Sequence, residues 1–496
     1  MDPENQIRPL AKPVLACAFP IFIIALIIYR LYLHPLSKYP GPKYAAVSGL
    51  VYWYVLVRGD LAHWYHRMHE QYGEVVRVGP NKLSFINPQA WKDIYGHKVG
   101  AAAKKAIMKD PASYPADDNG ERNIAVILDD REHSAVRKVF TNAFSDKALK
   151  QQESLIQGYV DKLVKNLYAT AGQETDMIKN YNCTTFDIMG DLAFGEPLGL
   201  LDNSEYSPWV KAIFNGIKAG ALMNFGFEYS AFGALSNILL PRSLREKKAM
   251  HFQYSVDRVE RRLEKGDVTD KPDFWTLVLS KGKDVLTRPK MHANSSAFMI
   301  AGTETTATLL SGLTYYLLKN PEAMAKVVRE VRALGSEDEL NLETLQRLPY
   351  LHACFEEAFR CYPPVPVGLW RLVTGQGTPV CGEWLPAGTR VTVPQWASYR
   401  SPRNFKDPER FIPERWLPDS GFETDRKDAL QPFSTGPRNC LGKNLAYHEM
   451  RIMFAKVLWH FDLQLSPRSE NWADQKVWTL WDKPDLFVTL KPVMRE

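Results

Sequence analysis

The sequence predicts a protein built mainly from helices, and three observations lead to that fold class. Apolar residues recur at helical spacing in 351–359 and again in 441–457. A long apolar segment occupies about 291–318 and ends before Asn320-Pro321. A further apolar segment lies near the N-terminus. Apolar residues make up 45% of the 496 residues, which is enough to form a large core.

Residues 13–33 are predicted to form a transmembrane anchor. They are nearly all apolar, and a helix of about 21 residues spans about 31 Å, close to the hydrocarbon thickness of a bilayer. Asp2 and Glu4 precede the segment and no small-residue cleavage site follows it, which argues against a cleaved signal peptide. The flanking Lys and Arg residues slightly favour a cytoplasmic body. Residues 1–12 are then a short tail, and 34–44 a proline-rich hinge.

A helical segment is expected at 131–140. His133 and Arg137 are separated by four positions, so they share one face of this helix. Two such side chains on one face could bind carboxylate groups of a ligand.

The centre of the long apolar helix, Ala301-Gly-Thr-Glu-Thr-Thr306, is unfavourable for a helix, because glycine and threonine lower helix stability relative to alanine. Such a defect often marks a functional site. Gly302 would leave room for a diatomic ligand against the backbone, and Glu304 and Thr305 provide an acid and an alcohol for delivering protons. The alternative is that the threonine hydroxyls only bond back to the preceding turn.

The periodic stretch at 351–359 is an amphipathic helix that ends at Pro363-Pro364. Glu357 and Arg360 lie on the same face of it. An ordinary surface ion pair is the alternative, and Glu356 with Arg360 would form one equally well. Such a pair would contribute only about 0.3–0.5 kcal/mol.

Cys440 lies in the segment Phe433-Ser-Thr-Gly-Pro-Arg-Asn-Cys-Leu-Gly442, which opens the last predicted helix. The glycines allow a tight turn and a close approach to a flat ligand, and a helix N-terminus favours a negatively charged, low-pKa sulfur. This arrangement suits a cysteinate bound axially to haem iron. The alternative is a cysteine that serves as a small buried apolar residue.

The Cys440 segment resembles the cysteine-ligand loop of the cytochrome P-450 family at every fixed position, namely Phe433, Gly436, Arg438, Cys440 and Gly442. Four further stretches resemble motifs of this family: 133–137, 301–306, Glu357-Ala-Phe-Arg360 and Phe411-Ile-Pro-Glu-Arg-Trp416. The resemblance covers about 35–490. It implies a mainly α fold with small β sheets, in which 45–496 form one haem-thiolate catalytic domain behind the transmembrane helix.

The resemblance implies haem b as the cofactor, with Cys440 as the axial thiolate ligand of the iron. Phe433, Gly436, Arg438 and Gly442 would form the loop around the ligand. His133, Arg137 and Arg371 would meet the haem propionates, although many family members carry tryptophan where His133 stands. Glu304 and Thr305 would be the catalytic residues that control proton supply. Glu357, Arg360 and Arg415 would form a structural network, for which the near-duplicate Pro408-Glu-Arg410 offers a second candidate arginine.

The resemblance also implies a monooxygenase that inserts one oxygen atom from O2 into an apolar small molecule. We see no flavin or nicotinamide domain, so the electrons would come from a separate NADPH-dependent flavoprotein reductase. The stretch 186–195 looks like fungal microsomal members of secondary metabolism, which suggests an endoplasmic reticulum location and a terpenoid or polyketide substrate. The alternatives are a haem-thiolate isomerase or dehydratase that needs neither O2 nor reductase and, more remotely, a non-enzymatic haem carrier or sensor.

The substrate pocket is the least specific prediction. By position it would include the loop at about 105–123, the region 214–227, Phe298, Ala301, Thr305, the stretch 365–369 with Val367 and Leu369, and Leu480 with Trp481. Each of these could equally belong to the core, because aromatic and aliphatic residues are common in both environments.

Composition excludes several other classes of protein. The net charge of +6 is modest, and we find no run of Lys and Arg typical of a dedicated nucleic-acid binder. The six cysteines have irregular spacing and form no C-x-x-C zinc pattern, which favours a reducing compartment. The glycosylation sequons at Asn182 and Asn294 are then expected to be chance matches.

Overall fold

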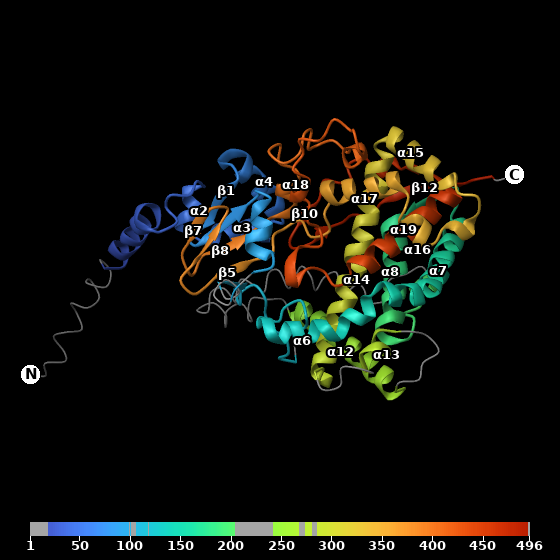
Figure 1. The fold of residues 1–496 in the computed structure, drawn as a ribbon, viewed down its shortest axis with the longest axis horizontal. Helices are drawn as coiled ribbons and strands as arrows, with labels where there is room; N and C mark the ends of the chain where they lie inside the picture. Colours follow the sequence, from blue (N-terminus) through green and yellow to red (C-terminus); the bar gives the residue numbers. More distant parts are fainter. Residues whose placement is uncertain are drawn as a thin grey trace, which may run out of the picture.

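The computed structural model describes residues 18–98, 100, 106–117, 119–203, 242–266, 273–279 and 285–494. Helices form most of the body, and small sheets gather at the end near the N-terminus (Figure 1). The predicted mainly α fold with small β sheets is therefore confirmed. The part of the predicted pocket at 214–227 lies outside the described residues.

The described helices are α2 (Lys43–Val47), α3 (Leu50–Val57), α4 (Leu61–Tyr72), α6 (Asp130–Thr141), α7 (Asp146–Ala169), α8 (Met177–Phe194), α9 (Leu200–Asn203), α12 (Arg242–Glu264), α13 (Phe274–Leu279), α14 (Arg288–Leu318), α15 (Pro321–Arg332), α16 (Leu342–Leu345), α17 (Pro349–Cys361), α18 (Gln395–Tyr399) and α19 (Lys443–His460). The strands are β1 (Val75–Gly79), β2 (Lys82–Phe85), β3 (Ile107–Lys109), β4 (Glu174–Asp176), β5 (Arg371–Val373), β6 (Thr378–Val380), β7 (Glu383–Leu385), β8 (Arg390–Thr392), β9 (Phe461–Leu465), β10 (Lys476–Val477), β11 (Trp481–Asp482) and β12 (Phe487–Pro492).

The largest sheet joins distant parts of the chain. Its five strands follow the order β1-β2-β8-β5-β3, so β5 and β8 from the C-terminal half lie between strands of the N-terminal third. The antiparallel pairing of β3 with β5 places Lys109 opposite Arg371. Two cationic side chains that are 262 positions apart in the sequence thereby become neighbours in one sheet.

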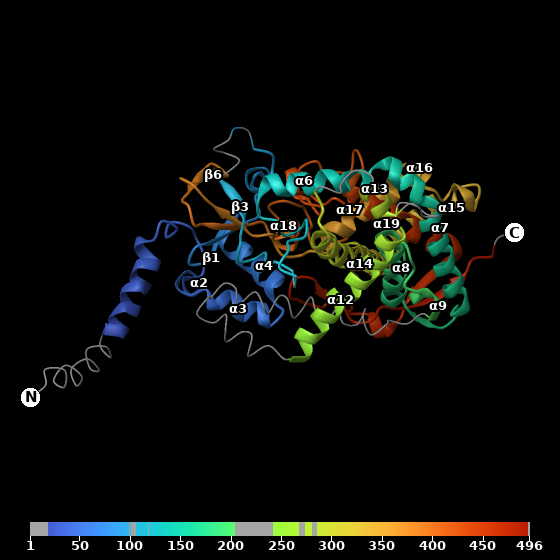
Figure 2. The same cartoon turned by 90° about the horizontal axis from the view of Figure 1, so that it is seen from below.

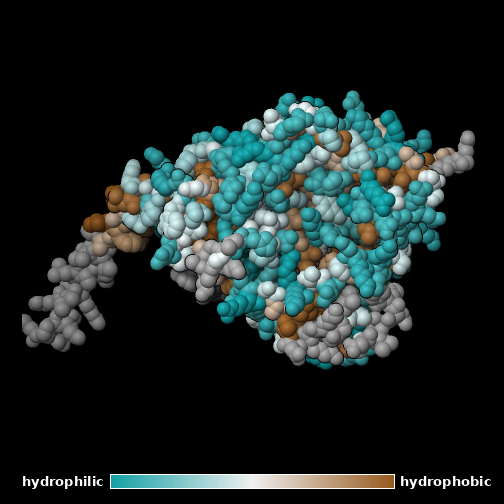
Figure 3. Space-filling model, in the orientation of Figure 1, coloured by the Kyte–Doolittle hydropathy of each residue, from teal (hydrophilic) through white to brown (hydrophobic). Residues whose placement is uncertain are grey.

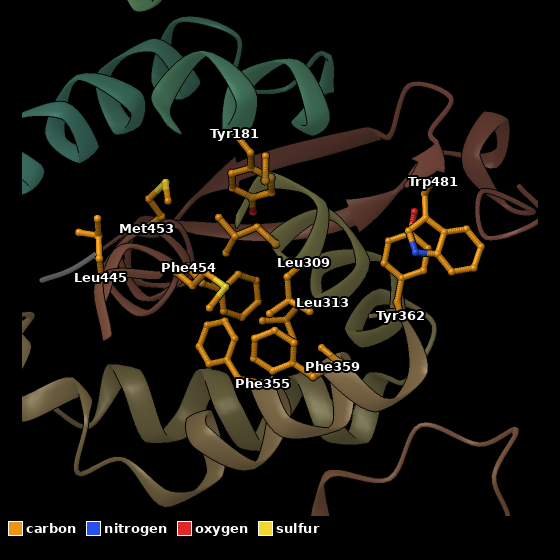
Figure 4. Packing of buried hydrophobic residues seen from close by; sticks show 14 of the residues in the cluster. Tyr181, Leu309, Leu313, Phe355, Phe359, Tyr362, Leu445, Met453, Phe454 and Trp481 are labelled. Carbon is orange, nitrogen blue, oxygen red and sulfur yellow. The ribbon is translucent and has the colours of Figure 1, made fainter. Parts of the chain in front are cut away.

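Helix α14 runs through the body and matches the long apolar segment predicted from the sequence (Figure 1). The Thr287 hydroxyl accepts a hydrogen bond from the Lys290 N–H and caps its start. It ends at Leu318, just before Asn320-Pro321, because proline cannot continue a helix. Figure 4 shows Leu309 and Leu313 of this helix facing aromatic side chains of α17 and α19.

Gly302 serves the packing of α14 against α8. A Cβ atom at this position would lie 2.5 Å from the Met189 sulfur of α8. The side that a Cβ would occupy thus faces Met189 and not the space for a diatomic ligand that the sequence suggested, and only glycine allows the two helices to approach so closely.

The predicted anchor is described from residue 18 onward, and its first residues, 13–17, lie outside the described part. Residues 18–28 are helical and continue into a π-helical turn at Tyr29–Leu33, and this segment projects from the body (Figure 2). Among the described residues, no helix is both long and apolar enough to cross a membrane. The predicted hinge is fixed to the sheet, because the Arg77 N–H donates to the Pro40 carbonyl at 2.7 Å.

Both sequons lie inside the folded body. The side chains of Asn182 on α8 and Asn294 on α14 are 1% and 0% exposed. The Asn294 carboxamide oxygen accepts from the Ile124 N–H at 2.9 Å. Neither side chain could carry a glycan in this fold, which agrees with the interpretation of the sequons as chance matches.

Candidate active site

Cys440 sits in a turn immediately before α19. Its N–H donates to the Phe433 carbonyl at 2.8 Å, which closes the loop between the two residues. Gly436 adopts a φ of +76°, and a Cβ atom there would lie 2.1 Å from the Tyr95 carbonyl oxygen. The loop therefore requires glycine at this position, both for its left-handed backbone and for its close approach to the neighbouring chain.

Of the cysteines that the structure describes, Cys440 alone has an exposed side chain. Burial by the surrounding protein nevertheless raises the pKa of the Cys440 thiol, although the Gly442 N–H bonded to the sulfur and the cations Arg137 and Lys443 act to lower it. The low pKa that we expected is thus not a property of the polypeptide alone. A metal cation bound to the sulfur would supply the missing stabilisation of the thiolate.

Arg137 of α6 holds the loop that contains Cys440. Its guanidinium donates to the Asn439 carbonyl at 2.7 Å and to the Asn439 side-chain oxygen at 2.6 Å. Arg438 is also occupied, because it donates to the Asp130 carboxylate at 2.6 and 2.9 Å and to the carbonyls of Ile127 and Leu128. These two residues, both predicted to bind the cofactor, therefore have protein partners that fix the loop against α6.

The remaining predicted cofactor contacts, His133 and Arg371, belong to a buried cluster of basic side chains. His133 is 5% exposed, and burial together with the nearby Arg438, Lys109, Arg137 and Arg371 lowers its pKa to about 3. The Nη1 atom of Arg371 is buried and has no hydrogen-bond partner among the described residues. Buried donors normally have partners, so this nitrogen indicates a site for an acceptor that comes from outside the chain.

Lys109 belongs to the same cluster, and sequence analysis missed it. Burial and the charges of Arg371 and Arg438 hold its pKa well below the usual range. Its ammonium group lies 4.4 Å from the Tyr114 ring centroid and donates to the Ala125 carbonyl. No sequence pattern indicated Lys109, since its strand has three residues and its pairing with β5 is long-range. A cluster of buried basic side chains beside an exposed cysteine fits the two carboxylates and the iron of haem.

On α14, Ala301 is exposed and Thr305, one turn later, is half-buried, in contrast to the buried Thr303, Glu304 and Thr306. The Thr305 hydroxyl donates to the Ala301 carbonyl at 2.7 Å, which is the back-bonding that we considered as an alternative. The neighbouring Glu304 is buried and forms an ion pair with Lys483. The predicted acid and alcohol are therefore adjacent in sequence, but their hydrogen bonds go to different partners.

The charge network at the end of α17 is confirmed. Both oxygens of Glu357 accept from Arg360, at 2.8 and 2.9 Å, and Arg415 adds a bond to Glu357 at 3.1 Å. All three side chains are fully buried. Arg415 also pairs with Asp425, which sequence analysis missed, so two guanidinium groups face two carboxylates.

The alternative partners that we considered lie elsewhere. Glu356 accepts from the Tyr447 hydroxyl rather than pairing with Arg360. The side chain of Arg410, from the near-duplicate segment, is 73% exposed. The structure thus identifies Arg415 as the arginine of the network.

The structure separates the predicted pocket residues. Phe298 belongs to the core, because its ring packs 4.9 Å from Phe140 and 5.9 Å from Phe274, centroid to centroid. Val367 is buried in the same core. Leu369 and Leu480 are half-buried, and Ala301 is exposed. Ala301 therefore has the position expected for contact with a ligand, whereas Phe298 has the core position that was the alternative for each of these residues.

Comparison with known proteins agrees with this site. The family model described as Cytochrome P450 matches residues 40–488. The cytochrome P450 monooxygenase FUM2 of Gibberella moniliformis is 50% identical over 468 residues, which cover 93% of this chain and 98% of that protein. The cytochrome P450 monooxygenase efuB of Hormonema carpetanum is 47% identical, with 94% of each chain covered. Averantin hydroxylase of Dothistroma septosporum is 40% identical over 95% of this chain and 90% of that protein.

Proposed function

The chain belongs to the cytochrome P450 family, and we propose that it is a membrane-anchored member that oxidises an apolar small molecule of fungal secondary metabolism. Its class of reaction follows from the family: it is a haem-thiolate monooxygenase that uses O2 and electrons from NADPH through a reductase. The observation that carries this conclusion is the loop of Cys440, an exposed cysteine beside a buried cluster of basic side chains.

Cys440 would bind the haem iron, and Arg371, His133 and Lys109 would face the haem carboxylates. The unpartnered Nη1 of Arg371 supports this assignment. When bound, the haem supplies the activation of O2, and its thiolate ligand donates electron density that favours cleavage of the O–O bond. The polypeptide contributes the orientation of the cofactor, since Arg137 and Arg438 fix the cysteine loop against α6.

Glu304 and Thr305 would supply protons to the reaction. Thr305 lies one turn from the exposed Ala301, so it borders the same space. Its hydroxyl can donate to a ligand when it leaves the Ala301 carbonyl, to which it now bonds. The buried Glu304 carboxylate lies next to it in the helix and retains one oxygen, Oε2, without a described partner.

The substrate would be a small, mainly apolar secondary metabolite. One of the similar proteins is named as a hydroxylase of averantin, which supports hydroxylation of a compound of this kind. The half-buried Leu369 and Leu480 would add apolar contacts near Ala301.

The protein would be anchored in the endoplasmic reticulum membrane, with its catalytic domain in the cytoplasm. Apolar side chains are exposed along the N-terminal helix (Figure 3). On α3, Leu50, Tyr54 and Val57 share one helical face and are each more than half exposed. Contiguous exposed apolar surface of this kind commonly contacts a membrane.

A flavoprotein reductase would dock on the face that carries the cysteine loop. Three exposed lysines lie next to residues that are part of this loop or of the helices around it. Lys443 begins α19, Lys138 follows Arg137, which donates to Asn439, and Lys147 follows Asp146, which accepts from Asn444. A positive face favours the approach of an acidic partner.

Reconstitution tests the proposal. The full chain, a microsomal NADPH-dependent reductase and fungal metabolite extracts are incubated with NADPH and O2, and products are identified by mass spectrometry. We expect a product one oxygen atom heavier than its substrate, formed only when NADPH, O2 and the reductase are all present. Product formation without NADPH would contradict the proposal.

A further inference from the structure

Lys483 forms a buried contact that the proposed function does not yet use. It follows β11, and its side chain is 5% exposed although it belongs to a short loop near the surface. Its ammonium group donates to Glu304 and, at 2.7 Å, to the Thr308 hydroxyl. Glu304 and Thr308 are one turn apart on α14, so a single cation joins two acceptors on one face of this helix.

The loop that carries Lys483 is fixed on both sides. Before it, the Trp481 indole N–H donates to the Pro363 carbonyl at 2.8 Å, and the ring stacks on Tyr362 at 4.7 Å between centroids. Figure 4 shows this stacked pair beside the core. After it, the Leu486 N–H donates to the Asp176 carboxylate at 3.1 Å. The ammonium group is therefore held in place by the fold and does not depend on the conformation of a free loop.

The pairing leaves Glu304 with one occupied and one free oxygen. Oε1 accepts from Lys483, whereas Oε2 is buried and accepts from no described residue. A buried carboxylate without a cation would take up a proton instead of remaining charged. Lys483 thus fixes the rotamer of the side chain through Oε1 and leaves Oε2 able to bind a proton and release it.

We infer that Lys483 is a positioning residue for proton supply: it holds Glu304 as a carboxylate, with Oε2 available for proton exchange. This inference rests on the proposed role of Glu304. Oε2 would take up one proton from solvent and pass it toward the site, so that Glu304 returns to its carboxylate form and to its ion pair after every transfer. A purely structural pair would affect stability and not the yield of product per NADPH. Even its effect on stability would be small in the double variant, because replacing both charged partners by neutral residues of similar size is often neutral for stability.

The test is a cycle of variants, Glu304→Gln, Lys483→Met and the double variant, each reconstituted with reductase. Lys483→Arg serves as the conservative variant, and Lys476→Met, at an exposed lysine of β10, is the matched control. The first readout is the ratio of product formed to NADPH consumed. We expect Lys483→Met to lower this ratio to the value of Glu304→Gln, with no further loss in the double variant. Lys483→Arg and Lys476→Met should keep the wild-type ratio.

The second readout is independent of turnover. Infrared difference spectra against the resting wild type should show an additional C=O stretch of a protonated carboxyl group in Lys483→Met, shifted in D2O. The buried Glu449, whose pKa burial raises well above its usual value, contributes equally to all the proteins and cancels. The double variant should lack the additional band, because it has no carboxyl group at 304.

Different results would overturn different statements. A wild-type ratio in Lys483→Met, the absence of the new band, or a further loss in the double variant relative to Glu304→Gln would each overturn the role of Lys483. A wild-type ratio in Glu304→Gln would overturn the proton role of Glu304 itself, and the inference with it. If Lys483→Met does not fold, the comparison of the double variant with Glu304→Gln decides, because the double variant buries neither charge of the pair.

Discussion

At the scale of single residues, Cys440 differs from the other described cysteines in being exposed inside a loop fixed by glycine and arginine. Cys440→Ala should abolish the red-shifted carbon monoxide band of a ferrous haem thiolate, because the thiolate ligand is removed. Visible difference spectra measure this band. Cys183→Ala, at a buried cysteine of α8, should keep it. A folded Cys440→Ala protein that retained the band would disprove the assignment.

Thr305 presents a choice between a structural and a catalytic hydroxyl, since it bonds to the Ala301 carbonyl in the structure. Thr305→Ala should preserve haem content and substrate binding while the ratio of product to NADPH falls by on the order of 10²-fold, the lower range for a positioned proton donor. The electrons would leave as hydrogen peroxide, which can be measured together with O2 consumption and product.

Thr303→Ala is the matched control for that measurement. Thr303 makes the same type of bond, to the Met299 carbonyl, but its side chain is fully buried. Its replacement should change stability slightly and leave the product ratio unchanged. Equal ratios in Thr305→Ala and the wild type would shift the proton role to Glu304, Thr306 or water.

At the scale of elements, the network of Glu357 joins α17 to the loop that carries Arg415 and Asp425. Arg415→Ala should destabilise the protein by about 3–5 kcal/mol, because it leaves buried carboxylates without a full set of partners. Glu357→Ala should have a comparable effect and yield protein with little haem. Thermal unfolding and the haem-to-protein ratio are the measurements.

Arg410→Ala is the control for this pair, since its side chain lies on the surface of the same loop and should contribute about 0–1 kcal/mol. Equal melting temperatures for Arg410→Ala and Arg415→Ala would contradict the buried network.

The same network makes the stability of the protein depend on pH, and the direction of this dependence follows from the pKa of Glu357. Burial alone would raise the pKa of Glu357, but Arg360 and Arg415 lower it below its usual value. The stabilisation is therefore present above the pKa of an unfolded glutamate, about 4.3, and is lost as pH falls through the lower folded value. Glu357→Gln should unfold more easily at neutral pH and show a weaker loss of melting temperature on acidification. A steeper loss than in the wild type would contradict this sign.

At the scale of the whole molecule, the N-terminal helix and α3 lie at the same end (Figure 2). Protein that lacks residues 1–33 should remain partly bound to microsomes, because Leu50, Tyr54 and Val57 still present apolar surface. Changing these three residues to serine should move the shortened protein to the supernatant after centrifugation. Tyr168→Ser, at an exposed site of α7, should not release it. Full release by the deletion alone would show that α3 makes no membrane contact.

The local features of this protein can be predicted from short stretches of its sequence. The turn of the Cys440 loop, the long helix before Asn320-Pro321 and the helix that ends at Cys361, before Pro363, follow from glycine, proline and apolar spacing, which act over a few positions. These patterns were sufficient to predict the mainly helical fold, the thiolate ligand and the pairing of Glu357 with Arg360, because each pattern lies within a single element or loop.

The contacts between distant residues, in contrast, become visible in the folded structure alone. Lys109 joins Arg371 through a strand pairing, Lys483 reaches Glu304 across 179 positions, and Asp425 completes the buried network. The folded structure also assigned Gly302 and Phe298 to packing rather than to a ligand. These contacts depend on how the helices and strands pack against one another in three dimensions. A pattern within a short stretch of sequence contains no information about the spatial distance to residues far along the chain.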